Sequence, residues 1–408
     1  MPHRRRIHWP LVLFWLFLSG SACVYVVLIP WADSFLSPED PSSPQAQLSL
    51  LIGEDVSGRA ATFFVVGWFF SLGASFGSFI NVVAWRIPHG ETILGSSRCP
   101  RCHVNISRWD NVPVVGWIQV RGHCRNCHSP ISPRYLIVEL LLGSIFSVLG
   151  VLLFFRSGIH LPNGPWYPLR SNASWVNFRV EPDLIRIYLY HAFLFTVLLA
   201  MALMRWDRLR MPSRFLFFCG FVAFTVPAIW PDVHPVLWNG ESPIRNAVQP
   251  IPWQLRLTTT LVGLFVGGIC GAVLGSIWPA KPFTSHRAET VMELGCAAEL
   301  CGAVLGWQAV ILVLSFAAAT RAGSAVVERG SAKVPNVPPA GFMLAATFAL
   351  VIAWNHIHCV SRSMTGPGGW ILIATVLLVS ALAVGLSRRM LRSKMAQLPE
   401  TTSDGSNP

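Results

Sequence analysis

Long apolar runs, separated by short polar or basic stretches, make up most of this chain. A run of about twenty apolar residues is long enough to cross a bilayer as a helix. The pattern predicts about ten such helices, at 11–30, 60–85, 135–155, 185–204, 215–230, 257–278, two within 289–320, 340–354 and 370–386. We therefore expect an all-α polytopic membrane protein.

The apolar stretch from Glu289 to Thr320 decides on which side the C-terminus lies. A single crossing would place the basic residues at 388–394 opposite the other basic loops. Two short helices, broken near Gly306 and Trp307, keep the basic loop 321–333 and the basic tail on the same side. Because basic loops concentrate in the cytoplasm, we predict two helices here.

Charge and composition agree with a membrane protein. Hydrophobic residues make up 53% of the chain and charged residues 12%, about half the charged share of soluble domains. The net charge of +12 follows from basic cytoplasmic loops, and no run of interleaved basic and aromatic residues predicts a nucleic-acid partner. The loop from Arg86 to Arg134 holds seven arginines against Glu91 and Asp110, which places it in the cytosol.

The N-terminus begins with a basic cluster, Arg4 to Arg6, followed by the apolar run 11–30. This order resembles a signal peptide, but the run is long enough to span and lacks a convincing small-residue cleavage site. We predict a retained first helix, and we expect both termini in the cytoplasm.

Four cysteines in two pairs lie on the arginine-rich loop: Cys99 with Cys102, and Cys124 with Cys127. Two Cys-x-x-Cys pairs about twenty residues apart can surround Zn²⁺ with four thiolates. The alternative is a pair of disulfides, which needs an oxidising compartment. Since the loop is expected in the cytosol, we predict a zinc-ribbon-like site.

The residues around these cysteines carry a family resemblance. The ordered motifs are Gly77-Ser-Phe-Ile-Asn-Val-Val83, Arg86-Ile-Pro88, Cys99-Pro-x-Cys102, Trp109-Asp-Asn-Val-Pro113, Gly116-Trp117, Gly122-x-Cys124-x-x-Cys127, Pro130-Ile-Ser-Pro-Arg-Tyr135 and Val138-Glu-Leu-Leu141. Together they resemble the N-terminal half of the prepilin peptidases, the type IV leader peptidases of bacterial inner membranes. Farther along, 302–308 resembles the second half of that family.

The resemblance implies a location, a substrate class and a chemistry. Family members remove the basic leader of prepilin-like or pseudopilin substrates at the cytoplasmic membrane face. They are aspartic endopeptidases in which two membrane-embedded carboxylates share a proton to activate water. Many also methylate the new N-terminal amine, so S-adenosylmethionine is a candidate cofactor.

This chain departs from the family at both catalytic positions. In the family the first aspartate lies seven residues before a proline, and counting back from Pro212 gives Arg205. The second lies about a dozen residues before Gly306-Trp, and the count gives Leu294. The nearest carboxylates, Asp207 and Glu293, are the candidate catalytic pair, each displaced from the expected register.

Two functions remain open from the sequence. The first is an active leader peptidase that uses Asp207 and Glu293. The second is an inactive relative that binds pilin-like substrates or assembly partners. If the protein is an inactive relative, we expect Asp207 to pair with a neighbouring arginine. We also expect Glu139 to hold the arginine-rich loop rather than to catalyse. A metal group at His356, His358 and Cys359 and a metal-transport role are weaker alternatives.

These patterns predict the following domain organisation. An extra helix and external loop occupy 1–58, and a prepilin peptidase-like domain occupies 59–155, with its cytoplasmic loop at 86–134. An external loop at 156–184 is followed by a degenerate peptidase-like core at 185–320, a C-terminal helix pair at 321–396 and a disordered tail at 397–408.

Overall fold

The computed structural model describes residues 44–164, 181–230, 233–239, 252–279, 287–330, 337–366 and 368–396. Within these ranges the regular structure is helical, and β-pairing is limited to two isolated bridges. The predicted all-α fold is therefore confirmed for this part of the chain. The predicted first helix at 11–30 and the tail at 397–408 lie outside the described residues.

The helices follow the apolar runs. In chain order they are α3 (Pro44–Arg86), α4 (Val115–Gln119), α5 (Arg134–Gly150) with the π-helical turn η2 (Val151–Phe155), α6 (Pro182–Trp206), α7 (Ser213–Ile229), α8 (Trp253–Ile277), α9 (Arg287–Leu305), α10 (Trp307–Gly330), α11 (Pro339–Ser363) and α12 (Gly369–Ala396).

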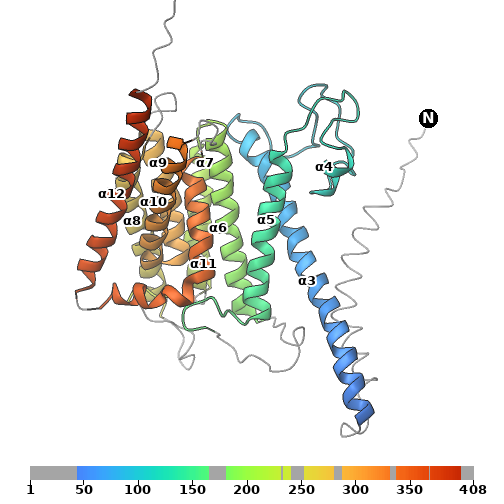
Figure 1. Ribbon diagram of the computed structural model, residues 1–408, viewed down its shortest axis with the longest axis horizontal. Coiled ribbons are helices and arrows are strands. Elements are labelled where there is room, and N and C mark those ends of the chain that lie inside the picture. The colour runs from blue at the N-terminus through green and yellow to red at the C-terminus, as the bar shows by residue number, and fades with distance from the viewer. Residues whose placement is uncertain are drawn as a thin grey trace, which may run out of the picture. The chain divides into compact units, whose positions relative to one another are not determined.

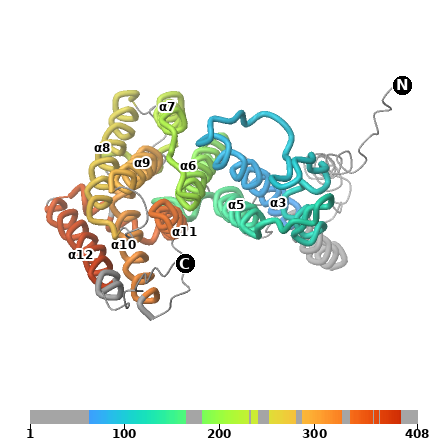
Figure 2. The backbone as a smooth tube through the Cα atoms, turned by 90° about the horizontal axis from the view of Figure 1, so that it is seen from above, coloured from blue at the N-terminus to red at the C-terminus, as the bar shows by residue number. Residues whose placement is uncertain are grey.

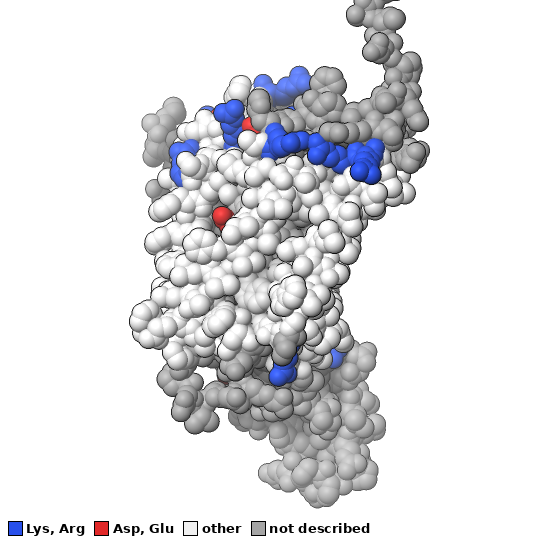
Figure 3. Space-filling model, turned by 90° about the vertical axis from the view of Figure 1, so that its left-hand side faces the viewer, with Lys and Arg blue, Asp and Glu red and all other residues white. Residues whose placement is uncertain are grey.

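Among the described residues, seven helical segments are long and apolar enough to cross a membrane: α3 from Thr62, α5 with η2, α6, α8, α10, α11 and α12. The apolar helix α7 is shorter, at 17 residues. On the face drawn in Figure 3, lysines and arginines gather mainly at one end and a broad middle band is almost uncharged. The chain is an integral membrane protein.

The break predicted in the stretch 289–320 is confirmed, because Gly306 separates α9 from α10. Gly306 has a φ of 91°, a left-handed conformation that glycine adopts without steric cost.

Two predicted boundaries are wrong. Helix α3 begins at Pro44, inside the segment that we expected to form an external loop, since proline suits the first turn and the residues after it favour a helix. Helix α10 continues past Thr320 to Gly330, so 321–330 is not a loop. Arg321 is buried there and pairs with Glu328 at 3.0 Å, which neutralises the charge that had suggested a loop.

The fold divides into two compact units, of which the first contains α3, α4, α5 and the start of α6 up to Tyr188. In this unit α3 and α5 lie side by side (Figure 1). Their backbones approach closely at Gly77, where an added Cβ would lie 2.9 Å from the Cα of Glu139. Elsewhere in this unit the aromatic rings of Phe69, Phe154 and Tyr188 pack together.

The second unit is a helical bundle around α9 (Figure 2). Helices α7, α8, α10 and α11 all contact α9. The most extensive contact is with α8, where glycines recur every four residues at 263, 267, 271 and 275. A Cβ at Gly267 would collide with the carbonyl of Ala298, and one at Gly271 would lie 2.5 Å from the carbonyl oxygen of Leu294. Small residues at this spacing allow two membrane helices to pack backbone to backbone.

Helix α6 is held in the bundle by two sets of contacts, which lie toward opposite ends of the helix. Near one end, the Tyr190 hydroxyl donates to the carbonyl oxygen of Ala223 at 2.6 Å and lies 3.3 Å from that of Ala303. At the other end, Arg205 contacts α9. Helix α6 is therefore anchored to α9 twice.

Two histidines in connecting segments of this unit are buried. His160 is 3% exposed and His234 is fully buried, with its Nε2 2.8 Å from the carbonyl oxygen of Ala303. Burial lowers the pKa of each imidazole to about 4. Both are therefore neutral at pH 7.

Candidate functional site

The four loop cysteines come together as predicted. Their sulfur atoms all lie within 4.8 Å of one another. The Sγ atoms of Cys99 and Cys127 are 3.8 Å apart, and those of Cys102 and Cys124 are 4.0 Å apart. In a tetrahedral thiolate site with bonds of about 2.3 Å, the sulfurs are about 3.8 Å apart. The cluster therefore has the dimensions of a metal site.

The backbone of each pair forms the same turn. In the first pair the N–H of Cys99 donates to Val104 at 3.0 Å, and the N–H of His103 donates back to Cys99 at 2.9 Å. The second pair repeats both bonds, among Cys124, His128 and Ser129. Both histidines have positive φ, 58° and 55°. Each turn thus directs two sulfurs toward the same point.

The chemistry of the cysteines favours metal binding over disulfides. All four are free thiols, whereas a disulfide needs a sulfur separation of about 2.05 Å. Hydrogen bonds from the backbone N–H groups of Cys102 and Arg101 lower the pKa of Cys99 to about 6. The Ser129 hydroxyl lowers the pKa of Cys127, whereas desolvation and the neighbouring Cys127 and Cys99 thiols raise that of Cys124. Thiolates are the form that binds metal.

Glu139 holds the cysteine-bearing loop to α5. Its Oε2 accepts a hydrogen bond of 2.6 Å from the backbone N–H of Val114, just before α4. Val114 has a φ of 64°, an uncommon conformation for a branched residue, so the bond stabilises a strained turn. The expectation that Glu139 holds the loop is confirmed, although its partner here is the backbone.

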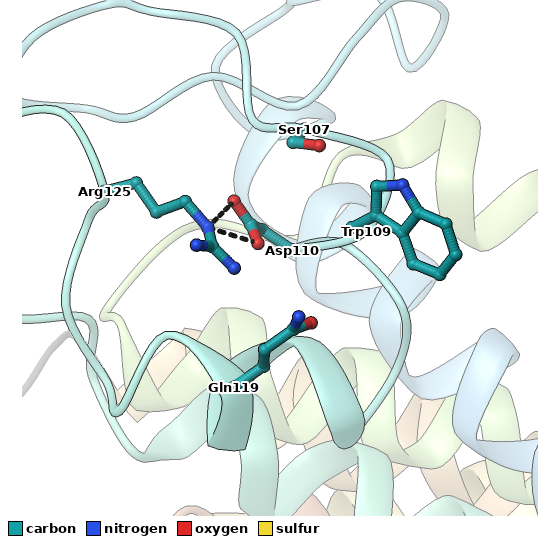
Figure 4. A pocket seen from close by; sticks show the side chains of 5 residues that line it. All are labelled: Ser107, Trp109, Asp110, Gln119 and Arg125. Carbon is teal, nitrogen blue, oxygen red and sulfur yellow. Dashed lines mark hydrogen bonds and ion pairs between the residues drawn. The ribbon is translucent and has the colours of Figure 1, made fainter. Parts of the chain in front are cut away.

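A shallow pocket of about 400 Å³ lies on the same loop (Figure 4). Its lining residues are Ser107, Trp109, Asp110, Gln119 and Arg125. Asp110 is engaged there, because Arg125 Nε donates to both of its carboxylate oxygens at 2.8 Å. The pocket offers an aromatic wall and polar groups, but its carboxylate already has a partner.

The second candidate centre lies where α6 meets α9, and Arg205 is at its middle. Arg205 Nε donates to Glu293 Oε2 at 3.0 Å, and Nη1 donates to Glu289 Oε2 at 2.9 Å. The Arg205 and Glu293 side chains are 7% and 1% exposed. We call these three residues the Arg205 cluster; it is a buried network of one guanidinium and two carboxylates.

Both oxygens of Glu293 are in use. The second one, Oε1, accepts a hydrogen bond of 2.8 Å from the backbone N–H of Ala340, in the first turn of α11. Glu293 therefore satisfies one of the N–H groups that a helix leaves free at its N-terminus. The carboxylate joins α9 to both α6 and α11.

The structure thus brings positions 205 and 293 into contact. Leu294, the residue in the second catalytic register, is completely buried. Asp207 follows the end of α6, and its N–H donates to the carbonyl of Leu203 at 3.1 Å. The assignment of Asp207 and Glu293 as a catalytic pair stays a prediction.

Glu289 was not among the candidate site residues, although the sequence contained a signal for it. It precedes Glu293 by four residues, so both carboxylates lie on one face of α9. It also approaches the exposed Arg210 at 3.4 Å. The weaker histidine alternative gains no support: among the described residues, the four loop cysteines form the only group with metal-ligand spacing, and His358 is buried while His356 is exposed.

Comparison with known proteins finds a family match for the loop, for α5 and for the end of α3. Residues 71–153 match the bacterial peptidase A24 N-terminal domain. The predicted resemblance is confirmed for this region. The A24 N-terminal domain contains the four cysteines, Glu139 and the pocket of Figure 4.

Curated relatives repeat this result. A prepilin leader peptidase/N-methyltransferase of Myxococcus xanthus is 46% identical over 78 residues, which are 19% of this chain and 23% of the relative. A type 4 prepilin-like proteins leader peptide-processing enzyme of Escherichia coli is 38% identical over 105 residues, covering 21% of this chain and 39% of the relative. The chain thus spans well under half the length of these relatives.

A longer and weaker match extends beyond the A24 N-terminal domain. A prepilin leader peptidase/N-methyltransferase of Burkholderia pseudomallei is 27% identical over 305 residues, covering 67% of this chain and 81% of the relative. No solved structure matches the chain.

Proposed function

We propose that this protein binds the basic leaders of prepilin-like or pseudopilin substrates in the membrane and does not cut them. The A24 N-terminal domain and the names of the relatives support the substrate class. The contact of Arg205 with Glu293 and Glu289 supports the absence of cleavage. That contact is the observation on which the proposal rests.

The physical reason lies in the proton that an aspartic peptidase must share. Two neighbouring carboxyl groups work because their repulsion leaves one protonated and one ionised. In the Arg205 cluster a guanidinium, which stays charged, stabilises the ionised form of both carboxylates. Leu294 supplies no acid at the other position. Both carboxylate oxygens of Glu293 are engaged, by Arg205 and by the N–H of Ala340, so neither is free to activate water.

A cleavage assay tests the proposal. The full chain in liposomes is incubated with a prepilin-like substrate that carries a basic leader, and both binding and cleavage are measured. We expect binding without cleavage. Cleavage that is lost in both Asp207→Asn and Glu293→Gln would overturn the proposal and make the displaced carboxylates the active pair.

We further propose that the four cysteines hold a structural Zn²⁺. The sulfur separations and the thiolate-favouring hydrogen bonds fit a closed site of four thiolates. Such a site supplies folding energy to a small loop rather than a position for substrate. Metal analysis of the purified chain, before and after chelation, tests this; less than one zinc per chain in freshly prepared protein would contradict it.

S-adenosylmethionine is the candidate second cofactor, because several relatives are named as N-methyltransferases. The pocket of Figure 4 is the place to look for it, since Trp109 offers an aromatic face and Ser107 and Gln119 offer polar groups. Equilibrium binding to the intact chain, compared with the Trp109→Ala variant, tests this assignment. Equal binding by both proteins would remove the pocket from consideration.

We place the protein in a bacterial inner membrane with both termini in the cytoplasm. The arginine-rich loop and the basic residues at 388–394 support this orientation. Reporter fusions after Arg134, Arg214 and Lys394 should all report the cytoplasm. An external report at Lys394 alone would mean that α9 and α10 do not form two crossings.

A further inference from the structure

Helix α9 is buried in the bundle except along one narrow strip. Beyond its first turn, its exposed residues are Met292 and Glu299, with Cys296 partly exposed between them. These three positions are four and three residues apart, so they lie on one face of the helix. We call Met292, Cys296 and Glu299 the α9 strip. It is the part of the central helix that another molecule can reach.

Glu299 places a carboxyl group where the surroundings are apolar. It lies six residues from Leu305, about 9 Å from that end of α9. It packs against Gly268, which lies within the candidate membrane span of α8. Among the described residues, Glu299 makes no hydrogen bond or ion pair. It points away from the Arg205 cluster, because six residues turn a helix by about 240° relative to Glu293.

The neighbouring helix is shaped around this side chain. A Cβ at Gly268 would lie 2.7 Å from Oε1 and 2.9 Å from Cγ of Glu299, so the glycine leaves the room that the side chain occupies. Phe265 and Ile269, on the same helix α8 as Gly268, are 67% and 63% exposed. The Glu299 carboxyl group therefore lies against a glycine of α8, a helix that also exposes large apolar side chains.

We propose that the α9 strip is a docking site for a transmembrane helix of another protein that carries a lysine or arginine at the depth of Glu299. An ionisable group at membrane depth is normally paired or faces water, and Glu299 has no partner of its own in the described part of the chain. A cation on a partner helix would complete the pair. Gly268 and Cys296 are small enough for the two backbones to approach closely.

This inference does not depend on whether the Arg205 cluster catalyses a reaction. The two sites lie on different faces of α9, so a change at Glu299 should leave the contacts of Arg205 intact. A second copy of this chain is a poor occupant of the α9 strip. Two copies that faced each other through the strip would bring two Glu299 carboxylates, which are like charges, together.

The experiment measures binding of a synthetic single-span peptide to the full chain in phosphatidylcholine nanodiscs. One peptide carries a single lysine at the depth of Glu299, a second carries it one helical turn away, and a third has leucine in its place. Energy transfer between labelled chain and labelled peptide reports binding. We expect the first peptide to bind about 5- to 30-fold more tightly than the third, as a hydrogen-bonded polar contact between membrane helices allows.

Glu299→Gln and Glu299→Leu should each abolish the preference for the lysine peptide. Thr225→Leu is the matched control, because the Thr225 hydroxyl is satisfied within its own helix α7 and its loss should change nothing. Cys296 gives an independent readout: with an added mild thiol oxidant, which takes up the two electrons, it should form a disulfide with a cysteine placed next to the lysine of the first peptide, and much less with the same cysteine in the third peptide. All variants should keep the metal content and melting temperature of the unmodified chain.

Equal binding by the lysine and leucine peptides would overturn the proposal. So would energy transfer between two copies of the chain that Glu299→Gln removes, because the occupant would then be a second copy. A preference for the displaced lysine would also contradict it, since the depth of Glu299 would not be what is recognised.

Discussion

Replacing Arg205 with methionine is the most direct test of the buried ion network. The substitution keeps an unbranched, flexible apolar chain but removes the guanidinium that contacts Glu293 at 3.0 Å and Glu289 at 2.9 Å. Glu293 is 1% exposed, so water cannot replace the lost partner. Its remaining contact is the hydrogen bond from Ala340.

Breaking a buried ion pair by removing one partner costs about 3–5 kcal/mol. Two carboxylates, four residues apart on α9, would also repel each other once the arginine is gone. We therefore expect Arg205→Met to lower the free energy of unfolding by at least about 3 kcal/mol. Arg210→Met is the control, because the Arg210 side chain is 83% exposed and the cost of losing its contact should stay below about 1 kcal/mol.

The assay is denaturant unfolding of the full chain in detergent micelles, with the thermal midpoint as a second measure. The double variant Arg205→Met with Glu293→Leu should recover most of the loss, since it removes the uncompensated charge together with its partner. Equal stability of Arg205→Met and the unmodified chain would refute the reasoning, because it would mean that the Arg205 guanidinium does not neutralise a buried charge.

Three further predictions concern the metal loop, the buried histidines and the helix packing. Cys124→Ser should release the metal and leave the loop more accessible to protease, as measured by metal content and digestion rate, because three ligands hold zinc less tightly than four. Stability should fall as the pH drops from about 6.5 toward 4, since His160 and His234 have folded pKa values of about 4 and accept protons first when unfolded. Each lowered pKa corresponds to about 3 kcal/mol of unfolding free energy lost over that range, so replacing both histidines with glutamine should make the unfolding free energy fall less steeply as the pH drops. Gly267→Leu should prevent stable packing of α8 on α9 and lower the thermal midpoint, whereas Gly220→Leu, where the structure leaves open space, should not.

Much of the fold could be read from the sequence because lipid imposes a simple rule. A membrane-spanning segment must satisfy its backbone internally, so apolar runs of sufficient length become helices. Gly306 also marked the break between α9 and α10 correctly. The rule failed at 321–330, because Arg321 is neutralised by Glu328 seven residues later and so does not end the helix.

The metal site was predictable for a related reason. Each Cys-x-x-Cys pair fixes two sulfurs within a single turn, so the spacing alone carries most of the geometry. The Arg205 cluster was not predictable in this way. Arg205 and Glu293 are 88 positions apart, and their contact depends on how α6 packs against α9. The four-residue spacing of Glu289 and Glu293 predicts that the two carboxylates share a face of α9, but it does not predict that Arg205 binds both of them.

The Arg205 cluster also determines how an attempt to restore peptidase activity should be designed. Introducing aspartates at both expected positions, by Arg205→Asp and Leu294→Asp, would remove the cation and add two carboxylates beside Glu289 and Glu293. Four neighbouring acids would hold several protons and destabilise the junction of α6, α9 and α11, so a silent double variant would say little about catalysis. Adding Glu289→Gln and Glu293→Gln removes the surplus charge and keeps an acceptor for the N–H of Ala340. Cleavage by this fourfold variant, with none by versions that lack either new aspartate, would show that the geometry for catalysis persists and that the Arg205 cluster replaced its chemistry.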